Sequence, residues 1–598
     1  MIKKLMSYTR EYKRQIFFIP VFIFLDVLCE LSMPLLMSKI VDVGIAGQDS
    51  NYIIRTGIEM TLLAIAAMAF GILNMKFTSI VSQGFGANLR NALFVKVQGF
   101  SFANIDKFST ASLVTRLTTD ANILQTTFMM IMRILLRGPL MLIIAFILAY
   151  NINARLSIVL AVAIPILVIS VWLIITRAVK LYMIVQDKLD VLNRTIQENL
   201  IGIRVVKSFV REDFEKTKFK KSNDELTDSA IRAANLGILN MPVMIFVMNS
   251  ATLAIIWFGG QMVFSKIMGP GELIGFMSYV FQILFSVMMI SMVVLMSARA
   301  KASGERVVEI LDTQIDIVDK PQSDNLLPSA GSEEPSALVS TAAIPATARG
   351  KVEFRNVCFK YSGNGNGENV LSDLNFTAEP GKVVAIVGGT GAGKSSLVSL
   401  IPRLYDASEG AVLVDDIDVR DYKLNTLRDE IGVVLQKNTL FSGTIRENLL
   451  WGNEHASQEE MNAACQDAQV YDFIQSLPKG FETELGQGGV NVSGGQKQRL
   501  CIARAILKKP KILILDDSTS AVDSATETKI RASFYQSLAD TTVFIIAQRI
   551  SSVREADQII VLDDGKIVGM GTHQELMESN EVYQEINASQ KEGALNHE

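Results

Sequence analysis

Residues 388–395 read GGTGAGKS, a glycine-rich loop that ends in a lysine and a serine. Glycines allow several backbone N–H groups to converge on one phosphate group. The apolar run 383–387 precedes the loop, and a helix is expected from Lys394, which is the context that a phosphate-binding loop needs. Lys394 is expected to reach the outer phosphates of a nucleoside triphosphate, and the Ser395 hydroxyl to coordinate Mg²⁺. The predicted phosphate-binding residues are Gly388, Gly389, Thr390, Gly391, Ala392, Gly393, Lys394, Ser395 and Ser396.

A second apolar run, Ile512–Leu515, ends in two consecutive carboxylates. The run predicts a buried strand, and Asp516 stands directly at its end. A carboxylate in this place commonly orients Mg²⁺ through the water shell of the ion. We therefore expect a magnesium site that involves Ser395 directly and Asp516 through water.

The elements that position these residues occupy only the second half of the chain. The 598 residues are too many for one ordinary domain, and 49% of them are hydrophobic. The long apolar runs lie before about residue 300, whereas the remainder alternates strand-like and helix-like segments. The net charge of −4 provides no basic field, so no nucleic-acid partner is expected.

The first half predicts a membrane domain. A spanning helix needs roughly 20 apolar residues. Lys and Arg are concentrated in the N-terminal tail and in the two long segments 81–127 and 176–237, and the opposite loops hold few of them. The sequence thus predicts a multi-pass protein of the cell membrane, with both termini and the soluble domain in the cytoplasm. The six predicted spans lie near Ile16–Val41, Met60–Ile80, Phe128–Tyr150, Leu156–Ile175, Ile238–Phe264 and Leu273–Met296.

The two long cytoplasmic segments keep the apolar spacing of helices and have few Gly or Pro residues. We therefore expect the spanning helices to continue well past the bilayer. Each pair of helices must then turn far from the membrane, near Phe100–Phe108 and near Phe209–Phe219. Short helices at these turns could contact a soluble domain.

Four ionisable residues lie within or close to the predicted spans. Asp26 and Glu30 are four residues apart, and so are Arg133 and Arg137, so each pair shares one helix face. Charges at this depth are costly and usually face a partner or a water-filled cavity. We favour a structural set of ion pairs. The alternative is a polar patch in a transport cavity that receives cationic substrates.

The sequence predicts four segments. Residues 1–312 form a membrane domain of six long helices, and residues 313–350, rich in Pro, Ser, Ala and Thr, form a flexible linker. Residues 351–585 form an α/β ATPase domain with a phosphate-binding loop, and residues 586–598 form a tail.

Together these features resemble the ABC transporters, and specifically the half transporters of the multidrug exporter type. The string VSGGQ at 492–496 is similar to the family signature, and VVLQKNTLFSGTI is similar to its Q-loop region. The resemblance implies that ATP and Mg²⁺ bind, that Tyr361 stacks on adenine, and that Gln436 meets Mg²⁺. It further implies that Asp523 belongs to the D-loop, and that two chains enclose each ATP. The residues that would contact the ATP held by the other chain are Ser493, Gly494, Gly495 and Gln496.

Two positions depart from the family pattern. The usual general-base Glu after Asp516 is Asp517, and the usual switch His is Gln548. An Asp carboxylate is about 1.5 Å shorter in reach, and Gln cannot become a cation. The resemblance therefore implies a degenerate ATP site in a heterodimer. The second half transporter would supply the Glu and His but have a degraded signature.

The expected substrate of such an exporter is a small hydrophobic or amphipathic compound that is moved across the lipid bilayer of the cell membrane. Three alternatives stay open at this point. The chain could belong to a lipid or peptide exporter, to an importer with an exporter fold, or to an ATP-binding regulatory subunit that transports nothing.

Overall fold

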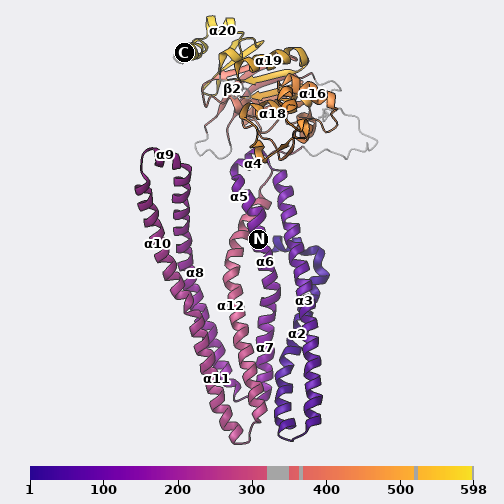
Figure 1. Ribbon diagram of the computed structural model, residues 1–598, viewed down its shortest axis with the longest axis vertical. Coiled ribbons are helices and arrows are strands. Elements are labelled where there is room, and N and C mark those ends of the chain that lie inside the picture. The colour runs from indigo at the N-terminus through magenta and orange to yellow at the C-terminus, as the bar shows by residue number, and fades with distance from the viewer. Residues whose placement is uncertain (320–348, 362–367, 518–522, 548, 596–598) are drawn as a thin grey trace, which may run out of the picture. The chain divides into compact units, whose positions relative to one another are not determined.

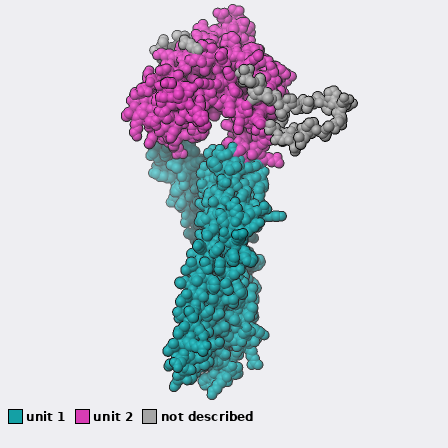
Figure 2. Space-filling view, turned by 90° about the vertical axis from the view of Figure 1, so that its right-hand side faces the viewer, with its two compact units in different colours: residues 1–98, 110–313 teal, residues 99–109, 314–598 magenta. Residues whose placement is uncertain are grey.

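The computed structural model describes residues 1–319, 349–361, 368–517, 523–547 and 549–595. The chain divides into two compact units, which Figure 2 distinguishes by colour. Unit 1 comprises residues 1–98 and 110–313, and unit 2 comprises residues 99–109 and 314–598. Residues 99–109, from the first predicted cytoplasmic turn, thus group with the second half of the chain and not with the helices on either side of them.

Unit 1 is built from long helices that run alongside one another (Figure 1). Within the described ranges, six helical runs are apolar and long enough to cross a membrane, which confirms the six predicted spans. Helix α3 has 49 residues, so it is about 70 Å long and extends past a bilayer core of about 30 Å. The runs are Ile2–Ile45 (α1 Ile2–Met6, η1 Ser7–Tyr12, α2 Lys13–Lys39 and η2 Ile40–Ile45), Ser50–Gln98 (α3), Thr110–Ile152 (α5 Thr110–Thr115, η3 Arg116–Asp120, α6 Ala121–Met130, η4 Ile131–Leu135 and α7 Leu136–Ile152), Ser157–Ile201 (α8), Glu212–Phe264 (α10 Glu212–Ile238 and α11 Asn240–Phe264), and Pro270–Ile290 within α12 (Pro270–Asp312).

Both turns between the long helices contain a short helix. The first, α4 (Phe102–Lys107), lies inside the predicted turn at residues 100–108. The second, α9 (Ile203–Ser208), begins earlier than predicted, so the turn spans residues 202–211 rather than 209–219. Glycine ends α8 at position 202, and α10 starts with Glu212, whose charge favours the positive end of a helix. Phe219 therefore lies inside α10.

Unit 2 contains three sheets within the described ranges. The largest has six strands, of which β12 alone runs antiparallel to its neighbour. The second sheet has four antiparallel strands, and the third has two. In spatial order the strands are β12 (Lys566–Gly571), β11 (Gln558–Asp563), β3 (Val383–Gly388), β10 (Thr542–Ile546), β9 (Ile512–Asp516) and β6 (Ile431–Val434); then β2 (Leu371–Ala378), β1 (Val352–Phe359), β4 (Glu409–Val414) and β5 (Ile417–Asp418); then β7 (Gly443–Thr444) and β8 (Glu484–Leu485).

The central strands β3, β9 and β10 of the six-stranded sheet are buried on both faces, as expected for parallel strands that read as continuous apolar runs. Side chains alternate between the faces, so Val384 and Ile386 pack toward the antiparallel sheet and α13. Val383, Ala385 and Val387 pack on the opposite face, against a helical layer. The helices of unit 2 besides α4 are α13 (Lys394–Leu400), α14 (Leu424–Asp429), α15 (Ile445–Leu450), α16 (Gln458–Asp467), α17 (Tyr471–Ser476), α18 (Gly494–Leu507), α19 (Ser524–Ser537), α20 (His573–Ser579) and α21 (Glu581–Leu595).

Candidate functional site

The phosphate-loop sequence lies between β3 and α13, as predicted. Gly393 has a φ of +92°, so any other residue there would be strained, and because its Cβ would lie 2.7 Å from Leu371 Cδ2 the leucine side chain would have to shift. Gly391 has a φ of +89°, and a Cβ there would meet only open space. The loop therefore needs glycine for its backbone conformation and leaves a free concave surface above it.

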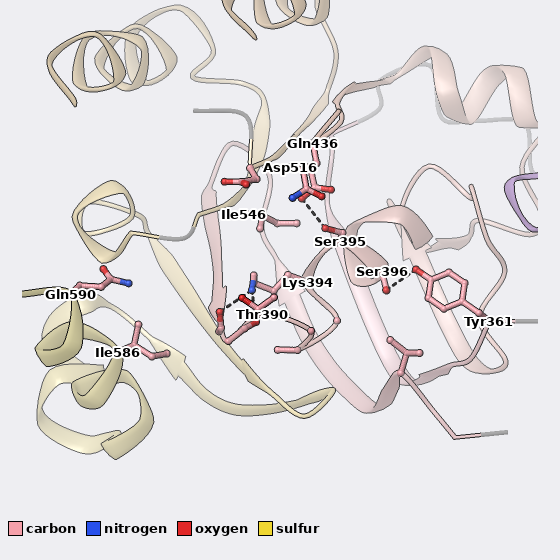
Figure 3. Close-up of a pocket in the computed structure, with 17 residues that line it drawn as sticks. Tyr361, Thr390, Lys394, Ser395, Ser396, Gln436, Asp516, Ile546, Ile586 and Gln590 are labelled. Atoms are coloured by element: carbon pink, nitrogen blue, oxygen red, sulfur yellow. Dashed lines mark hydrogen bonds between the residues drawn. The ribbon is translucent and has the colours of Figure 1, made fainter. Parts of the chain in front are cut away.

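The polar side chains of the loop and of the end of β9 are held by hydrogen bonds within the protein. Lys394 Nζ donates to the carbonyl oxygens of Gly388 and Gly389, at 2.8 and 2.7 Å. Ser395 Oγ donates to Asp516 Oδ1 at 2.9 Å. Figure 3 shows both sets of bonds as dashed lines. The predicted pair of Ser395 and Asp516 is thus in direct contact.

The protonation of these groups reflects their burial. Burial raises the pKa of Asp516, and the hydrogen bond from Ser395 only partly opposes this shift. Burial also lowers the pKa of Lys394, against the attraction of Asp517 and Asp516. Each charged form therefore lacks sufficient compensation within the chain. A polyanion beside Lys394 and a cation beside Asp516 would stabilise both, so these residues fit a triphosphate with Mg²⁺.

The surrounding pocket has a volume of about 620 Å³, which is enough for a nucleotide. Tyr361 lies at one end, where its hydroxyl shares a 2.8 Å hydrogen bond with Ser396 Oγ (Figure 3). Gln436 directly follows the β6 region and also lines the pocket. The structure thus gathers the loop residues 388–396, Tyr361, Gln436 and Asp516 around one cavity, and their ligand roles remain predictions.

Asp517 lines the same pocket, with its backbone held in place. Its φ is +48°, a left-handed conformation that Asp tolerates better than most residues. The Asp517 N–H donates to Ile546 O at 3.2 Å, and its carbonyl accepts from Gln498 Nε2 at 3.2 Å. The reach of this carboxylate is therefore set by the length of its side chain. Gln548, the second departure from the family pattern, lies outside the described residues.

The signature and the D-loop residue lie elsewhere in unit 2. Ser493 Oγ accepts from Gln496 N at 3.3 Å, and Gln496 Oε1 accepts from Ser493 N at 2.8 Å, which caps α18. Ser493 and Gly494 are exposed to solvent. Asp523 similarly caps α19 by accepting from Thr526 N at 2.9 Å, and this bond lowers its pKa.

Sequence reasoning missed four residues that line the pocket, namely Val370, Ile546, Ile586 and Gln590. Ile586 and Gln590 come from α21 and lie at the end opposite Tyr361 (Figure 3). Gln590 Oε1 accepts a 2.8 Å hydrogen bond from Ile550 N, close to the switch position. Residues 586–595, assigned to a tail from the sequence, continue this helix. Its helical spacing of Val582, Tyr583 and Ile586 was an available signal.

The charged residues of unit 1 form a cluster centred on Arg137. Its Nη1 lies 3.1 Å from Asp26 Oδ2, an ion-pair distance without hydrogen-bond geometry, and its Nη2 donates to Glu30 Oε2. Arg133 is exposed and makes no ion pair within the described ranges. The structure therefore pairs Arg137 with both carboxylates, whereas the favoured set also included Arg133; the structural and the cavity interpretations of the cluster stay predictions.

Two cavities of about 480 and 460 Å³ border this cluster. Both are lined by Glu30, Met141 and Phe285, and further methionines line each of them. Arg133 and Arg137 line the smaller one. The surface is thus mostly apolar and flexible, with a few charges at one side.

The chain matches known proteins along its whole length. Residues 16–288 match the ABC transporter transmembrane region, and residues 371–520 match the family described as ABC transporter. An uncharacterized ABC transporter ATP-binding protein of Bacillus subtilis, YfiB, is 37% identical, and the match covers 98% of each chain. The putative multidrug export ATP-binding/permease protein YgaD of the same organism is 33% identical, again over 98% of each chain.

The fold also matches a solved structure, that of a bacterial Atm1-family ABC exporter with ATP bound. The TM-score is 0.76 at 25% sequence identity, over 97% of this chain and 98% of the other. The six apolar helical runs make the chain a multi-pass membrane protein, and its second half is an ATP-hydrolysing domain. With this arrangement and these relatives, the chain belongs to the ABC transporters, as an exporter-type half transporter that carries one transmembrane domain and one ATPase domain.

Proposed function

We propose that this chain is one half of a heterodimeric exporter in the cell membrane, with its ATPase domain in the cytoplasm. Its own phosphate loop holds ATP in a slow site. Its signature completes a fast site on a second half transporter, which has the usual Glu and His. When bound, ATP would supply the phosphoanhydride bond whose hydrolysis drives the transport cycle, and Mg²⁺ would neutralise charge on its phosphates. The exported compounds are hydrophobic or amphipathic.

The observation that carries this proposal is the carboxylate at position 517. The bonds of the Asp517 backbone to Ile546 and Gln498 restrict any shift toward the phosphates. A Glu side chain would reach about 1.5 Å further, by one carbon–carbon bond. Misplacing a catalytic group by about 1 Å can cost on the order of 100-fold in rate. An attacking water is therefore poorly positioned by this chain.

The signature of this chain has the features of a working one. Ser493 already orders the start of α18 through its capping box, and the same residue is exposed. The N-terminus of a helix attracts phosphate oxygens. A chain with an impaired base but an intact signature is suited to support hydrolysis of a nucleotide that another chain holds.

The two membrane cavities support the proposed substrate class. Apolar and methionine side chains dominate their lining, which suits compounds of varied shape. Their size of about 480 and 460 Å³ suits small organic molecules. Export rather than import is inferred from the family arrangement, and transport into inverted vesicles tests the direction.

The decisive experiment measures ATP hydrolysis by the purified full-length chain without a partner. The unmodified chain should be slow. Replacing both departures, Asp517→Glu with Gln548→His, should raise the rate by about 100-fold because both changes restore positioned groups. Adding Ser493→Ala to this pair should remove the gain, since each site needs a signature.

Asp564→Glu is the matched control. Asp564 also follows a strand, is exposed and has a left-handed φ of +43°, so its replacement tests backbone strain without touching the pocket. It should leave the rate unchanged. Fast hydrolysis by the unmodified chain alone, equal to that of the doubly changed chain, would falsify the degenerate-site proposal.

A further inference from the structure

Helix α4 has a defined position within unit 2. Ser101 Oγ accepts from Asn104 N at 3.1 Å, which caps the helix. The Asn104 amide then donates to Gln314 O and to Asp316 Oδ2, both at 3.1 Å. The rings of Phe100 and Phe108 stack at 5.9 Å and are buried beside it. A residue that bonds to α4 therefore bonds to a fixed element.

Tyr405 connects α4 to the nucleotide pocket. It lies five residues after the end of α13, and its hydroxyl donates to Asp106 Oδ2 at 2.6 Å. Its ring lies 6.0 Å from that of Phe102. On its other side the same ring meets Tyr361 in a perpendicular contact at 5.2 Å.

Tyr361 continues the connection to the phosphate-loop helix. Its hydroxyl shares a 2.8 Å hydrogen bond with Ser396 Oγ, in the first turn of α13. Phe359 packs against both Tyr361 and Tyr405, with ring centroids 4.8 and 5.5 Å away. Each step from α4 to α13 is thus a direct hydrogen bond or ring contact.

We propose that Tyr405 is a positioning residue that couples filling of the adenine subsite to the placement of α4. This rests on the proposed stacking of adenine on Tyr361. A stacked base restricts the Tyr361 ring, and a perpendicular ring pair depends on the orientation of both members. The Tyr405 ring is restricted in turn, and with it the hydroxyl that holds Asp106. Because coupling is reciprocal, α4 in this position also favours binding of the base.

The hydroxyl of Tyr405 is suited to this role throughout the physiological pH range. Burial and the neighbouring Asp106 carboxylate both raise the pKa of Tyr405. The hydroxyl therefore stays protonated and remains a donor to Asp106. The coupling should not vary with pH between about 6 and 8.

The test is hydrogen–deuterium exchange of residues 99–109 in the full-length chain, with Mg²⁺ and either ATP, tripolyphosphate or neither. Tripolyphosphate has the phosphates without the base. In the unmodified chain, ATP should slow exchange about fivefold more than tripolyphosphate does. Tyr405→Phe and Asp106→Ala should each reduce this difference to less than about twofold. The double variant should reduce it no further, since both changes remove the same hydrogen bond.

Tyr535→Phe is the matched control, because the Tyr535 hydroxyl donates to Glu555 O at 2.8 Å, away from the pocket and α4. It should behave as the unmodified chain. The proposal is overturned if Tyr405→Phe keeps the extra slowing of exchange by ATP. It is also overturned if the double variant loses as much of this slowing as the two single variants lose together.

A separate measurement distinguishes this inference from the adenine role on which it rests. Tyr361→Ala should lower the affinity for ATP but not for tripolyphosphate. An unchanged ratio of the two affinities refutes adenine stacking on Tyr361. A lowered ratio, together with unchanged exchange in Tyr405→Phe, refutes only the role of Tyr405.

Discussion

Charges are arranged in opposite ways in the nucleotide pocket and in the membrane cluster. In the pocket, Lys394 donates to carbonyl oxygens of its own loop, and Asp516 accepts from a serine. Neither makes an ion pair with a residue of the described ranges. In the membrane cluster, the Arg137 guanidinium contacts both Asp26 and Glu30 directly. Opposite charges are thus separated in one region and joined in the other.

We propose that this difference distinguishes a ligand-binding site from a structural ion-pair cluster. Charges that are kept apart and partly desolvated are stabilised when a ligand with complementary charges enters. Charges that already neutralise one another gain little from a further ligand, and each is costly to leave alone. The comparison therefore predicts ligand effects for changes in the pocket and stability effects for changes at Arg137.

The largest effect is expected from breaking the membrane cluster. Arg137→Met leaves Asp26 and Glu30 without their cation, so it should lower the free energy of unfolding by about 3–5 kcal/mol. Adding Asp26→Asn and Glu30→Gln removes the whole cluster and should restore most of the loss. Thermal unfolding, followed by intrinsic tryptophan fluorescence, measures the stability of the single variant and of the triple variant.

Arg133→Met is the matched control for this series, because Arg133 lines a cavity that Arg137 also lines and makes no ion pair with any described residue. It should leave the unfolding temperature nearly unchanged. If Arg133→Met alters the range of transported compounds while the neutral triple variant does not, the cluster is structural and Arg133 faces the substrate. Loss of transport per folded molecule in the triple variant would contradict that separation.

A second effect is expected from Lys394. Lys394→Met should reduce the affinity for ATP by about 100-fold, because one charged partner of the phosphates is lost. Lys508→Met is the control: Lys508 Nζ also donates to two carbonyl oxygens, of Arg428 and Ile431, at 2.5 and 3.2 Å, but lies outside the pocket. It should lower stability and leave ATP affinity unchanged. Calorimetric titration and thermal unfolding together would show whether the two lysines differ in this way.

A smaller effect concerns pH. Because the folded-state pKa of Asp516 is raised, the nucleotide-free chain loses stability as pH rises through that raised value. Binding of ATP with Mg²⁺ needs the charged carboxylate, so affinity should rise over the same pH range, at most about tenfold per pH unit. Affinities measured by titration at several pH values should show this rise, and Asp516→Asn should abolish it.

Asp467 offers a matched control for this pH effect. Burial also raises its pKa, and Ser537 Oγ donates to it at 3.1 Å, yet it lies at the end of α16 and outside the pocket. Asp467→Asn should remove part of the pH dependence of stability without changing that of nucleotide affinity. If both variants alter the affinity profile equally, Asp516 does not act at the binding site.

The strongest sequence predictions rested on local patterns. The strands that end at Gly388 and Asp516 are continuous apolar runs, and the helix that starts at Lys394 follows a glycine-rich loop. The membrane helices could be predicted in the same way, because each contains a long apolar run. The second cytoplasmic turn was placed too late, because apolar spacing continues through it and only Gly202 and the acidic start of α10 indicate the break.

Residues brought to the site by tertiary packing could not be predicted in this way. Tyr405 and Gln590 have no motif around them, and their roles depend on which distant element each one contacts. The ion pairs of Arg137 were predicted only as a set, because spacing along two helices does not determine which guanidinium faces which carboxylate.

The smallest effect is expected at Gln590, where α21 meets the segment after β10. Gln590→Ala removes the acceptor of the Ile550 N–H, which should cost about 1 kcal/mol and loosen the backbone beside the switch position. Gln584→Ala is the control on the same helix, because Gln584 bonds Met577 O and does not line the pocket. If α21 is a wall of the nucleotide pocket, the first change should lower ATP affinity about threefold, and the second should not. Equal effects of the two changes on ATP affinity would mean that α21 acts on the domain only through its overall stability, and that the charges at Lys394 and Asp516 define the site without it.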